Sequence, residues 1–127
     1  MRIGEAASAA GLPVKTVRYY ADIGLIEPSA RAENGYREYS ADDIKRLAFV
    51  RRSRAFGFSV PECRDLLALY ADDNRSAGDV KQLAEERLKD IEAKQAELAA
   101  LHDTLSKLVH ACQGGDRPNC PIIDHLA

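Results

Sequence analysis

Apolar residues recur at helical spacing along most of this 127-residue chain, and short polar stretches interrupt the pattern. The first interruption, at residues 11–13, separates an alanine-rich helix expected over 5–10 from a second helix expected over 14–21. Gly11 suits a sharp turn there, and the proline that ends the interruption favours the first turn of the next helix. Two short helices joined by a glycine-containing turn are the layout of a helix-turn-helix unit. On the second helix, we expect Val14 and Val17 to face inward.

The other face of the second helix carries residue types that contact phosphates and base edges in DNA complexes. These residues are Lys15, Thr16, Arg18 and Tyr19. Farther along, Asn34-Gly35 stands between alternating residues and predicts a β-hairpin turn. Arg31, Tyr36 and Arg37 surround that turn, so the hairpin would bring cations and an aromatic ring to a second DNA backbone site, as a wing does. By residue types alone, a solvated helical hairpin and a hairpin that merely closes the fold stay open as alternatives.

Two further helices are predicted by capping boxes, in which a serine and an acidic residue three positions later satisfy the first N–H groups of a helix. Ser40 with Asp43 would begin a strongly basic helix, and Ser59 with Glu62 would begin the next one. Cys63 lies in this second helix, far in sequence from the other cysteines. The favoured role for Cys63 is that of a buried structural thiol.

The longest uninterrupted helical pattern runs over residues 79–111 and contains no glycine or proline. Apolar residues recur in it every seven positions, at Ala84, Ile91, Leu98 and Leu105. A helix of roughly 30 residues spans about 45–50 Å, so residues 1–70 alone cannot cover its apolar stripe. We therefore expect a partner helix from a second copy of the chain. A monomer whose long helix folds back is the alternative.

Two of the three cysteines, Cys112 and Cys120, flank a seven-residue loop that begins where this helical pattern ends. Cys112 is also the next position of the seven-residue series. The loop lacks the short Cys-x-x-Cys pairs that are usual in zinc sites. Two thiolates alone suit a soft monovalent ion that accepts linear coordination, above all Cu(I), and the apolar residues 121–123 could enclose it. Four further side chains could complete a tetrahedral site in principle: His110, Asp116, Asp124 and His125.

Composition limits the remaining possibilities. Residues 1–70 hold 11 Lys and Arg against 9 Asp and Glu, whereas residues 71–127 hold 7 against 11, so the net charge of −2 hides an N-terminal half that can face nucleic acid. No apolar run approaches the roughly 20 residues that span a bilayer, and the first residues lack a signal-peptide layout. We therefore expect a cytoplasmic protein with no membrane partner, whose cysteines are thiols or metal ligands rather than disulfides.

No catalytic constellation stands out, because neither a Ser/His/Asp set, nor paired acids, nor a phosphate-binding loop occurs at a persuasive spacing. The sequence therefore does not predict an enzyme. A copper chaperone or storage protein would need the thiol loop but not the N-terminal half. A redox switch through a Cys112–Cys120 disulfide stays open as a further alternative.

Four short motifs follow one another in the first seventy residues: Arg18-Tyr-Tyr20, Gly24-Leu-Ile26, Asn34-Gly-Tyr-Arg37 and Gly57-Phe-Ser59. In this order and spacing, residues 1–70 resemble the MerR family of transcription regulators. The resemblance implies a winged helix-turn-helix domain that binds palindromic promoter DNA as a homodimer. It also implies that the long helix is the antiparallel dimerisation helix. It places Lys15, Thr16, Arg18 and Tyr19 on the recognition helix, and Arg31, Tyr36 and Arg37 on the wing.

The loop itself resembles the copper-responsive, CueR-like branch of that family in Cys112, the seven-residue gap and Cys120-Pro-Ile-Ile123. Divalent-ion members carry an additional cysteine at the start of the dimerisation helix, where this chain has Ser76 and Ala77. The copper branch commonly has a serine at the position of Ala77, so the effect of this departure on selectivity stays open. A divalent-metal sensor is thus the runner-up.

The CueR-like resemblance implies one Cu(I) per monomer, held by Cys112 and Cys120, with Ag(I) and Au(I) as mimics. It also implies that bent and undertwisted promoter DNA becomes readable by RNA polymerase, at genes for copper efflux or detoxification. The predicted fold is mainly α-helical and has four parts. They are a winged helix-turn-helix DNA-binding domain (1–70), a linker (71–78), a dimerisation helix forming an antiparallel coiled coil (79–111), and a metal-binding loop with a short C-terminal helix (112–127).

Overall fold

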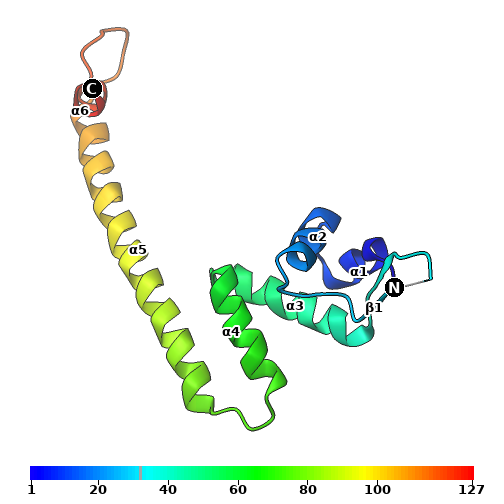
Figure 1. The fold of residues 1–127 in the computed structure, drawn as a ribbon. Helices are drawn as coiled ribbons and strands as arrows, with labels where there is room; N and C mark the ends of the chain where they lie inside the picture. Colours follow the sequence, from blue (N-terminus) through cyan, green and yellow to red (C-terminus); the bar gives the residue numbers. More distant parts are fainter. Residues whose placement is uncertain (32) are drawn as a thin grey trace. The chain divides into compact units, whose positions relative to one another are not determined.

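In the computed structural model, the described residues are 1–31 and 33–127, and they form six helices and a two-stranded sheet (Figure 1). The chain is therefore mainly helical, as the sequence predicts. It divides into two compact units, Met1–Leu83 and Ala84–Ala127. None of the helices in these described ranges combines the length and the apolar character needed to cross a membrane.

The first two helices form the predicted helix-turn-helix. Helix α1 spans Ile3–Ala10 and α2 spans Val14–Asp22. Between them Gly11 adopts a left-handed conformation with φ of 74°, which a side chain would disfavour, and this ends α1. The buried face of α1 consists of alanines, so α2 can approach closely, as predicted: Ala6, Ala7 and Ala10 are at most 2% exposed.

One expectation for α2 is wrong. Val17 is fully buried, but Val14 is 37% exposed. Val14 is the first residue of α2, at the end of the turn, and it precedes the part of the helix that contacts the core. The inward face of α2 therefore consists of Val17, Tyr20 and Ala21.

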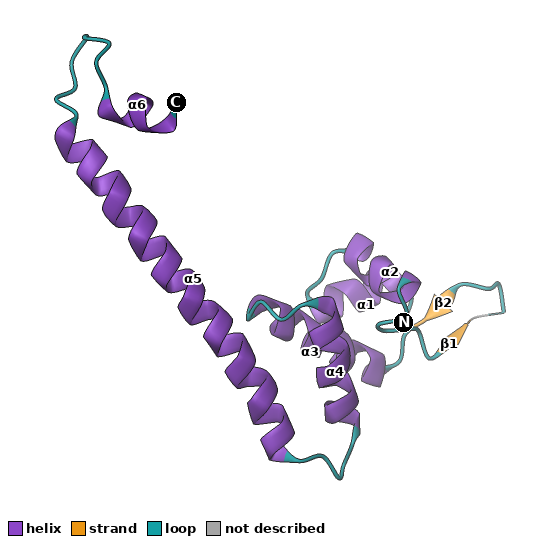
Figure 2. Cartoon of the chain, turned by 60° about the vertical axis from the view of Figure 1, so that its left-hand side comes forward, coloured by secondary structure: helices purple, strands orange, loops and turns teal. Residues whose placement is uncertain are grey.

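The predicted hairpin is present, and its two short strands are drawn in orange in Figure 2. Strand β1 spans Ala30–Arg31 and β2 spans Arg37–Glu38. They pair antiparallel, with Ala30 opposite Glu38 and Arg31 opposite Arg37. The turn contains Asn34 and Gly35 as expected, while residue 32 lies outside the described part of the chain.

Both predicted capping boxes are formed. Helix α3, Ala41–Ala55, begins with the reciprocal bonds of Ser40 and Asp43. Helix α4, Val60–Ala71, begins with those of Ser59 and Glu62. A capping interaction of this kind stabilises a helix by about 1 kcal/mol.

The carboxylate of Asp43 also fastens the hairpin to α3. It is fully buried, and it accepts hydrogen bonds from the Ser29 hydroxyl at 2.7 Å, the Ser29 N–H at 2.9 Å and the Ser40 N–H at 2.8 Å. Arg46 forms an ion pair with the same group. Burial raises the pKa of Asp43, but the donors from Ser40, Ser29 and Arg46 outweigh it and lower the pKa to about 2.

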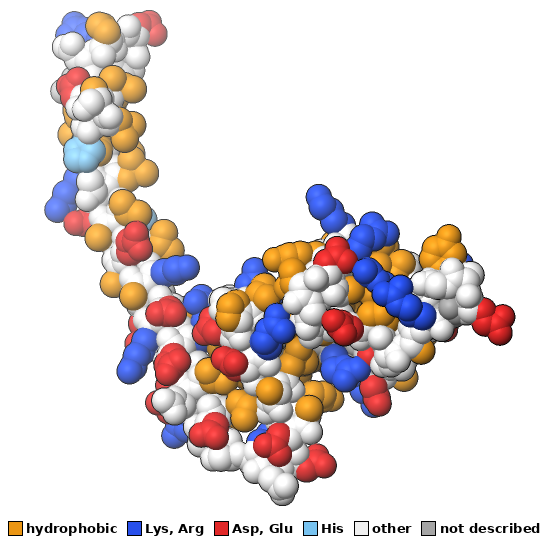
Figure 3. Space-filling model, in the orientation of Figure 1, with side chains coloured by type: hydrophobic (Ala, Val, Ile, Leu, Met, Phe, Trp, Pro, Cys, Tyr) orange, Lys and Arg blue, Asp and Glu red, His pale blue; other side chains and the backbone are white. Residues whose placement is uncertain are grey.

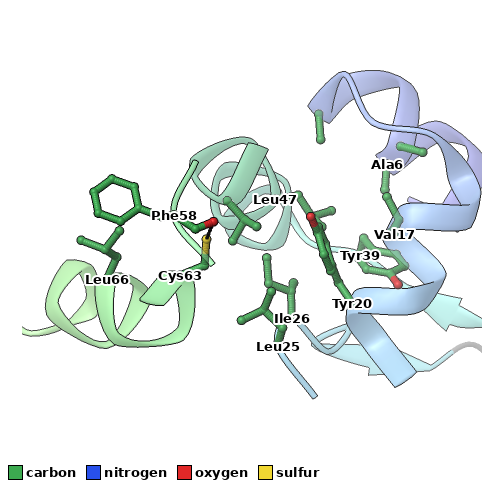
Figure 4. Close-up of a cluster of buried hydrophobic side chains, with 13 residues drawn as sticks. Ala6, Val17, Tyr20, Leu25, Ile26, Tyr39, Leu47, Phe58, Cys63 and Leu66 are labelled. Carbon is green, nitrogen blue, oxygen red and sulfur yellow. Dashed lines mark hydrogen bonds between the residues drawn. The ribbon is translucent and has the colours of Figure 1, made fainter. Parts of the chain in front are cut away.

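The core of the first unit gathers side chains from all four helices and from the end of the hairpin (Figure 4). The largest fully buried apolar side chains are Val17, Tyr39, Leu47, Val50 and Cys63. The Cys63 thiol donates to the Phe58 carbonyl oxygen at 3.9 Å. Cys63 is thus a buried core residue, as predicted.

Helix α5 is the longest element and spans Ala77–Ala111. It begins before the expected start at residue 79 because the Ser76 hydroxyl accepts a hydrogen bond from the Gly78 N–H at 3.1 Å and so caps the first turn. No residue of α5 is buried. Five of its large apolar side chains are 52–65% exposed: Leu88, Leu98, Leu101, Leu105 and Val109. A loop then leads to the short helix α6, Pro121–Leu126.

Candidate metal centre and nucleic-acid interface

The outer face of α2 presents most of the residues that the sequence predicts for DNA contact. Lys15, Arg18 and Tyr19 are exposed, and Thr16 is partly buried. The burial of Val17 and Tyr20 on the opposite face fixes this orientation. The residues predicted for DNA contact are therefore exposed because the core takes up the opposite face of α2.

The hairpin presents the other predicted group of residues. Asn34 shapes the turn, because its side-chain oxygen accepts a hydrogen bond from the Tyr36 N–H at 3.1 Å. Arg31 donates to the Gly35 carbonyl oxygen at 3.1 Å across the turn. Tyr36 is 61% exposed, so its ring is available to a partner.

Arg37 is less available than its neighbours. Its guanidinium donates to the Asp22 carboxylate at 3.0 Å and forms an ion pair with it. Arg18, in contrast, makes no such contact with the described part of the chain. The two arginines, which the sequence treats as equivalent phosphate ligands, thus start from different electrostatic environments.

The structure regroups the predicted DNA-binding residues around two hollows. Arg18 lies with the hairpin in a hollow that is also lined by the start of α1; its lining includes Arg2, Arg18, Arg31, Tyr36 and Arg37. The other three predicted residues of α2, which are Lys15, Thr16 and Tyr19, line a second hollow. Arg54 of α3 also lines this second hollow. Sequence reasoning missed Arg2 at the first hollow and Arg54 at the second. No sequence signal marks Arg2, because the first helix is expected to begin only at residue 5, whereas α1 begins at Ile3.

Two other arginines, although exposed, use their side chains to link elements of the first unit. Arg51 donates to the Ala10 carbonyl oxygen at the end of α1, at 2.9 Å. Arg64 donates to the carbonyl oxygens of Ile23 and Gly24 after α2, at 3.3 Å each. These bonds satisfy carbonyl groups that a helix end leaves without partners. Much of the positive charge of α3 and α4 therefore serves the fold.

In the second unit, Cys112 directly follows α5, and its N–H donates to the Leu108 carbonyl oxygen at 3.1 Å. Cys120 occupies the cap position of α6. Between them Gly114 and Gly115 adopt left-handed φ values of 71° and 81°, which reverse the chain. As a result, the two predicted metal ligands come together: their sulfur atoms lie 3.8 Å apart, and both side chains are partly buried.

This thiol pair fits a shared soft metal ion. Its separation is well beyond the S–S bond length of about 2.05 Å. Two bonds of about 2.3 Å, the length in zinc thiolates, would place the sulfurs about 4.6 Å apart across a linear centre, so an outward shift of less than about 1 Å would suffice. Within residues 1–31 and 33–127, no three His, Cys, Asp or Glu side chains come together as metal ligands.

The start of α6 favours the thiolate form of Cys120. The backbone N–H of Ile123, and less strongly that of Ile122, lowers the pKa of Cys120, and the Cys112 thiol contributes in the same direction. Of the apolar residues that follow, Pro121 and Ile122 are partly buried. Ile123 is 62% exposed, so within this chain it does not enclose the pair as expected.

The pKa of the Cys63 thiol is shifted in the opposite direction to that of Cys120. Burial raises the pKa of Cys63, and its thiol lies in the core of the first unit. The three cysteines therefore separate into one thiol buried in the core and one partly buried pair in the loop.

Comparisons with known proteins identify the family to which a chain with this helix-turn-helix, hairpin and cysteine pair belongs. A family model described as "MerR HTH family regulatory protein" matches residues 1–69, and another described as "MerR, DNA binding" matches residues 44–108. The chain belongs to the MerR family. It is therefore a DNA-binding transcription regulator and not an enzyme, as the sequence predicts.

Individual MerR-family relatives match along the whole chain. It is 55% identical to the transcriptional regulator HmrR of Rhizobium leguminosarum bv. viciae, over 100% of this chain and 98% of the relative. It is 39% identical to the regulator CueR of Salmonella typhimurium, over 100% of this chain and 92% of the relative. The crystal structure of the regulator PbrR691 from Ralstonia metallidurans CH34 in complex with lead(II) matches with a TM-score of 0.85 and 35% identity, over 100% of this chain and 99% of that one.

Proposed function

We propose that this MerR-family chain is a cytoplasmic, homodimeric sensor of Cu(I) that activates transcription. One Cu(I) ion per monomer would bind to Cys112 and Cys120, and Ag(I) or Au(I) would substitute for it. The observation that carries the proposal is the thiol pair, whose sulfur atoms lie 3.8 Å apart at the joint between α5 and α6.

The choice of a monovalent ion rests on donor chemistry. Thiolates are soft ligands that suit Cu(I) as well as Zn(II), and two of them alone are enough for the linear coordination that Cu(I) accepts. Two thiolates with one monovalent cation leave a net charge of −1, which the N–H groups at the start of α6 partly compensate. A divalent ion would usually take further ligands, and the described part of the chain gathers no third metal-binding side chain at this pair.

A divalent-metal sensor is the second candidate. The similar protein PbrR691 has been crystallised with lead(II), so the family scaffold also accommodates a divalent ion. At the start of α5, where divalent-ion members would have a further cysteine, this chain has Ala77, and the hydroxyl of Ser76 caps the helix. This difference supports the monovalent reading.

The homodimer is supported by the exposed stripe of α5. Five large apolar side chains of one helix, each at least 52% exposed, form a surface that water solvates poorly; the orange atoms along this helix are visible in Figure 3. The stripe keeps the seven-residue spacing from Ile91 to Leu105. A second copy, packed antiparallel, would cover it, because each helix then offers the other the same apolar row.

In the proposed mechanism both the metal-free and the metal-bound dimer bind the operator. Metal binding would link Cys112 to Cys120, with a slight outward shift of their sulfurs, and would thereby change how the end of α5 and the start of α6 are held. The ion shifts the population towards the activating form only if it binds that form more tightly. That form bends and undertwists the promoter so that RNA polymerase can engage both of its elements, at genes for copper efflux or detoxification.

In vitro transcription from the cognate promoter tests this function. We expect activation by Cu(I), Ag(I) and Au(I) and none by Zn(II) or Hg(II) at equal occupancy. Activation by Zn(II) or Hg(II) alone would favour the divalent-metal sensor. Failure of the protein to form a sequence-preferring complex with promoter DNA in a gel shift would favour a copper chaperone.

Arg18 and Arg37 should differ in their contribution to operator binding. Arg18→Ala should weaken binding and lower the slope of log K against log salt by about 0.9 per protomer, because one phosphate contact is lost. Arg37→Ala should have a smaller effect, since Arg37 must first give up part of its ion pair with Asp22. Asp22→Asn, which releases Arg37, should strengthen binding and steepen the slope. Fluorescence anisotropy over a salt series measures all three, and equal effects of the two arginine variants would contradict this difference.

A further inference from the structure

The hollow between the start of α1, the middle of α2 and the hairpin is unusual in its charge. It is lined by four arginines, Arg2, Arg18, Arg31 and Arg37, and none of its described lining residues is acidic. Like charges repel one another when they converge on one concave surface, and such a surface attracts anions. Figure 3 shows blue Lys and Arg side chains gathered on this unit beside the tip of the hairpin.

Most of the hydrogen-bond donors in this hollow remain available. A guanidinium carries five N–H donors. Arg31 uses one of them on the Gly35 carbonyl oxygen. Arg18 makes no hydrogen bond or ion pair with the described residues, and only Arg37 is paired with a carboxylate, that of Asp22.

Arg2 is held in place without using its donors. Its guanidinium carbon lies 4.8 Å from the centre of the Tyr36 ring, over the ring face. A cation–π contact of this kind orients the flat guanidinium but leaves its N–H edges free. Because Tyr36 belongs to the hairpin and Arg2 precedes α1, the contact also links two segments that are far apart in the sequence.

We propose that this hollow is a binding site for one backbone phosphate of the operator duplex, and that Arg2 is a ligand of that phosphate which Tyr36 positions. Arg18 and Arg31 complete the site from α2 and from the hairpin. The inference rests on the proposed function, in that it assigns a further contact to the same DNA-binding surface. The occupant is a duplex phosphate because the site adjoins the exposed face of α2, where Arg18 reaches it from the same helix as Lys15 and Tyr19.

The proposed site assigns a specific role to the ring of Tyr36, which is to position Arg2. Sequence reasoning predicts Tyr36 as a direct DNA contact, whereas this arrangement makes it act through Arg2. Tyr36→Phe keeps the ring and should therefore bind as the unchanged protein does. Tyr36→Leu removes the ring face and should weaken binding, but only while Arg2 is present.

The test measures affinity and salt dependence for Arg2→Gln, with Arg52→Gln as the matched control. Arg52 is an exposed arginine of α3 that lines neither of the two hollows, so its loss removes the same charge from the same unit. We expect Arg2→Gln to weaken binding about tenfold per protomer and to lower the salt slope by about 0.9 per protomer. The loss should be equal for operator and scrambled duplexes, since a phosphate contact carries no base information. Arg52→Gln should change neither quantity.

A methylphosphonate scan then identifies the phosphate. Neutralising one backbone phosphate at a time should reveal a position that costs Arg2→Gln clearly less affinity than it costs the unchanged protein, because Arg18 and Arg31 still contact that phosphate in the variant. Arg2→Lys, which keeps the charge without the flat guanidinium, should lie between the two proteins in affinity. In a double-mutant cycle, Arg2→Gln and Tyr36→Leu should be markedly less than additive.

Two results would overturn the proposal. If Arg2→Gln behaves as Arg52→Gln does, Arg2 is not a phosphate ligand. If every neutralised phosphate costs both proteins equally, Arg2 acts only through the general field of the domain. Both outcomes leave operator binding by the unchanged protein intact. They therefore differ from a failure of the proposed function, in which the unchanged protein itself would not bind the operator.

Discussion

Cys112→Ser and Cys120→Ser will each abolish the transcriptional response to Cu(I), while the metal-free protein still binds its operator. Each change leaves a single thiolate, and the pair that now lies 3.8 Å apart can no longer share an ion. The residues predicted to contact DNA lie on α2 and the hairpin, in the other compact unit. Operator affinity should therefore stay within about twofold, as is usual when partly exposed residues outside the binding surface are replaced. In vitro transcription and gel shift on the same preparations measure the two properties.

Cys63→Ala is the control for these thiol variants. It also reduces the number of thiols from three to two, but its thiol is buried in the core. We expect it to bind one Cu(I) per monomer in an anaerobic titration and to respond normally, at a cost of about 1 kcal/mol in stability. A Cys63→Ala protein that loses the response, or loop variants that retain it, would contradict the assignment of the metal site.

Asp43→Ala should strongly destabilise the first unit, by about 3–5 kcal/mol. It removes a buried carboxylate that three donors and Arg46 satisfy, and leaves those donors without a partner. Asp43→Asn should also destabilise the fold, because its amide group presents a donor where only acceptors fit. Urea unfolding followed by circular dichroism measures the free energy of unfolding.

The pH dependence of stability provides an independent check on Asp43. Because folding lowers its pKa from 3.8 to about 2, the carboxylate contributes about 2 kcal/mol above pH 4. That contribution should be lost as the pH falls towards 2, and the Asn variant should lack this part of the acid transition. Asp42→Asn, an exposed neighbour in the same helical turn, should behave as the unchanged protein does. An acid transition that survives in Asp43→Asn would show that other groups cause it.

The local elements could be predicted from the sequence because their signals are local. Ser40 with Asp43 and Ser59 with Glu62 predict both helix starts, and Asn34-Gly35 predicts the hairpin turn. The bonds from Asp43 to Ser29 could not be predicted in this way. They join residues 14 positions apart. Nothing in the capping pattern indicates that the carboxylate also accepts hydrogen bonds from the N–H and the hydroxyl of Ser29.

The candidate sites were predictable in their residues but not in their grouping. Cys112 and Cys120 stood out as a pair, yet only the left-handed glycines between them explain how the loop brings their sulfurs together. Arg18 and Arg37 looked equivalent, but the partner of Arg37 is Asp22, on a different element. Charge counts along a chain cannot separate these cases, because side chains that are far apart in sequence decide which cations are already engaged.

The arginines that cap α1 and α2 have a consequence for mutational scanning. Arg51 and Arg64 hold carbonyl groups at the ends of the two helices that carry the recognition surface. An alanine scan of basic residues would find weak operator binding at these positions as well as at Arg18, although for a different reason. Thermal melting separates the two classes, since Arg51→Ala and Arg64→Ala should lower the melting temperature and Arg18→Ala should not. The arginines of this unit thus divide into those that stabilise its fold and those that are proposed to contact DNA.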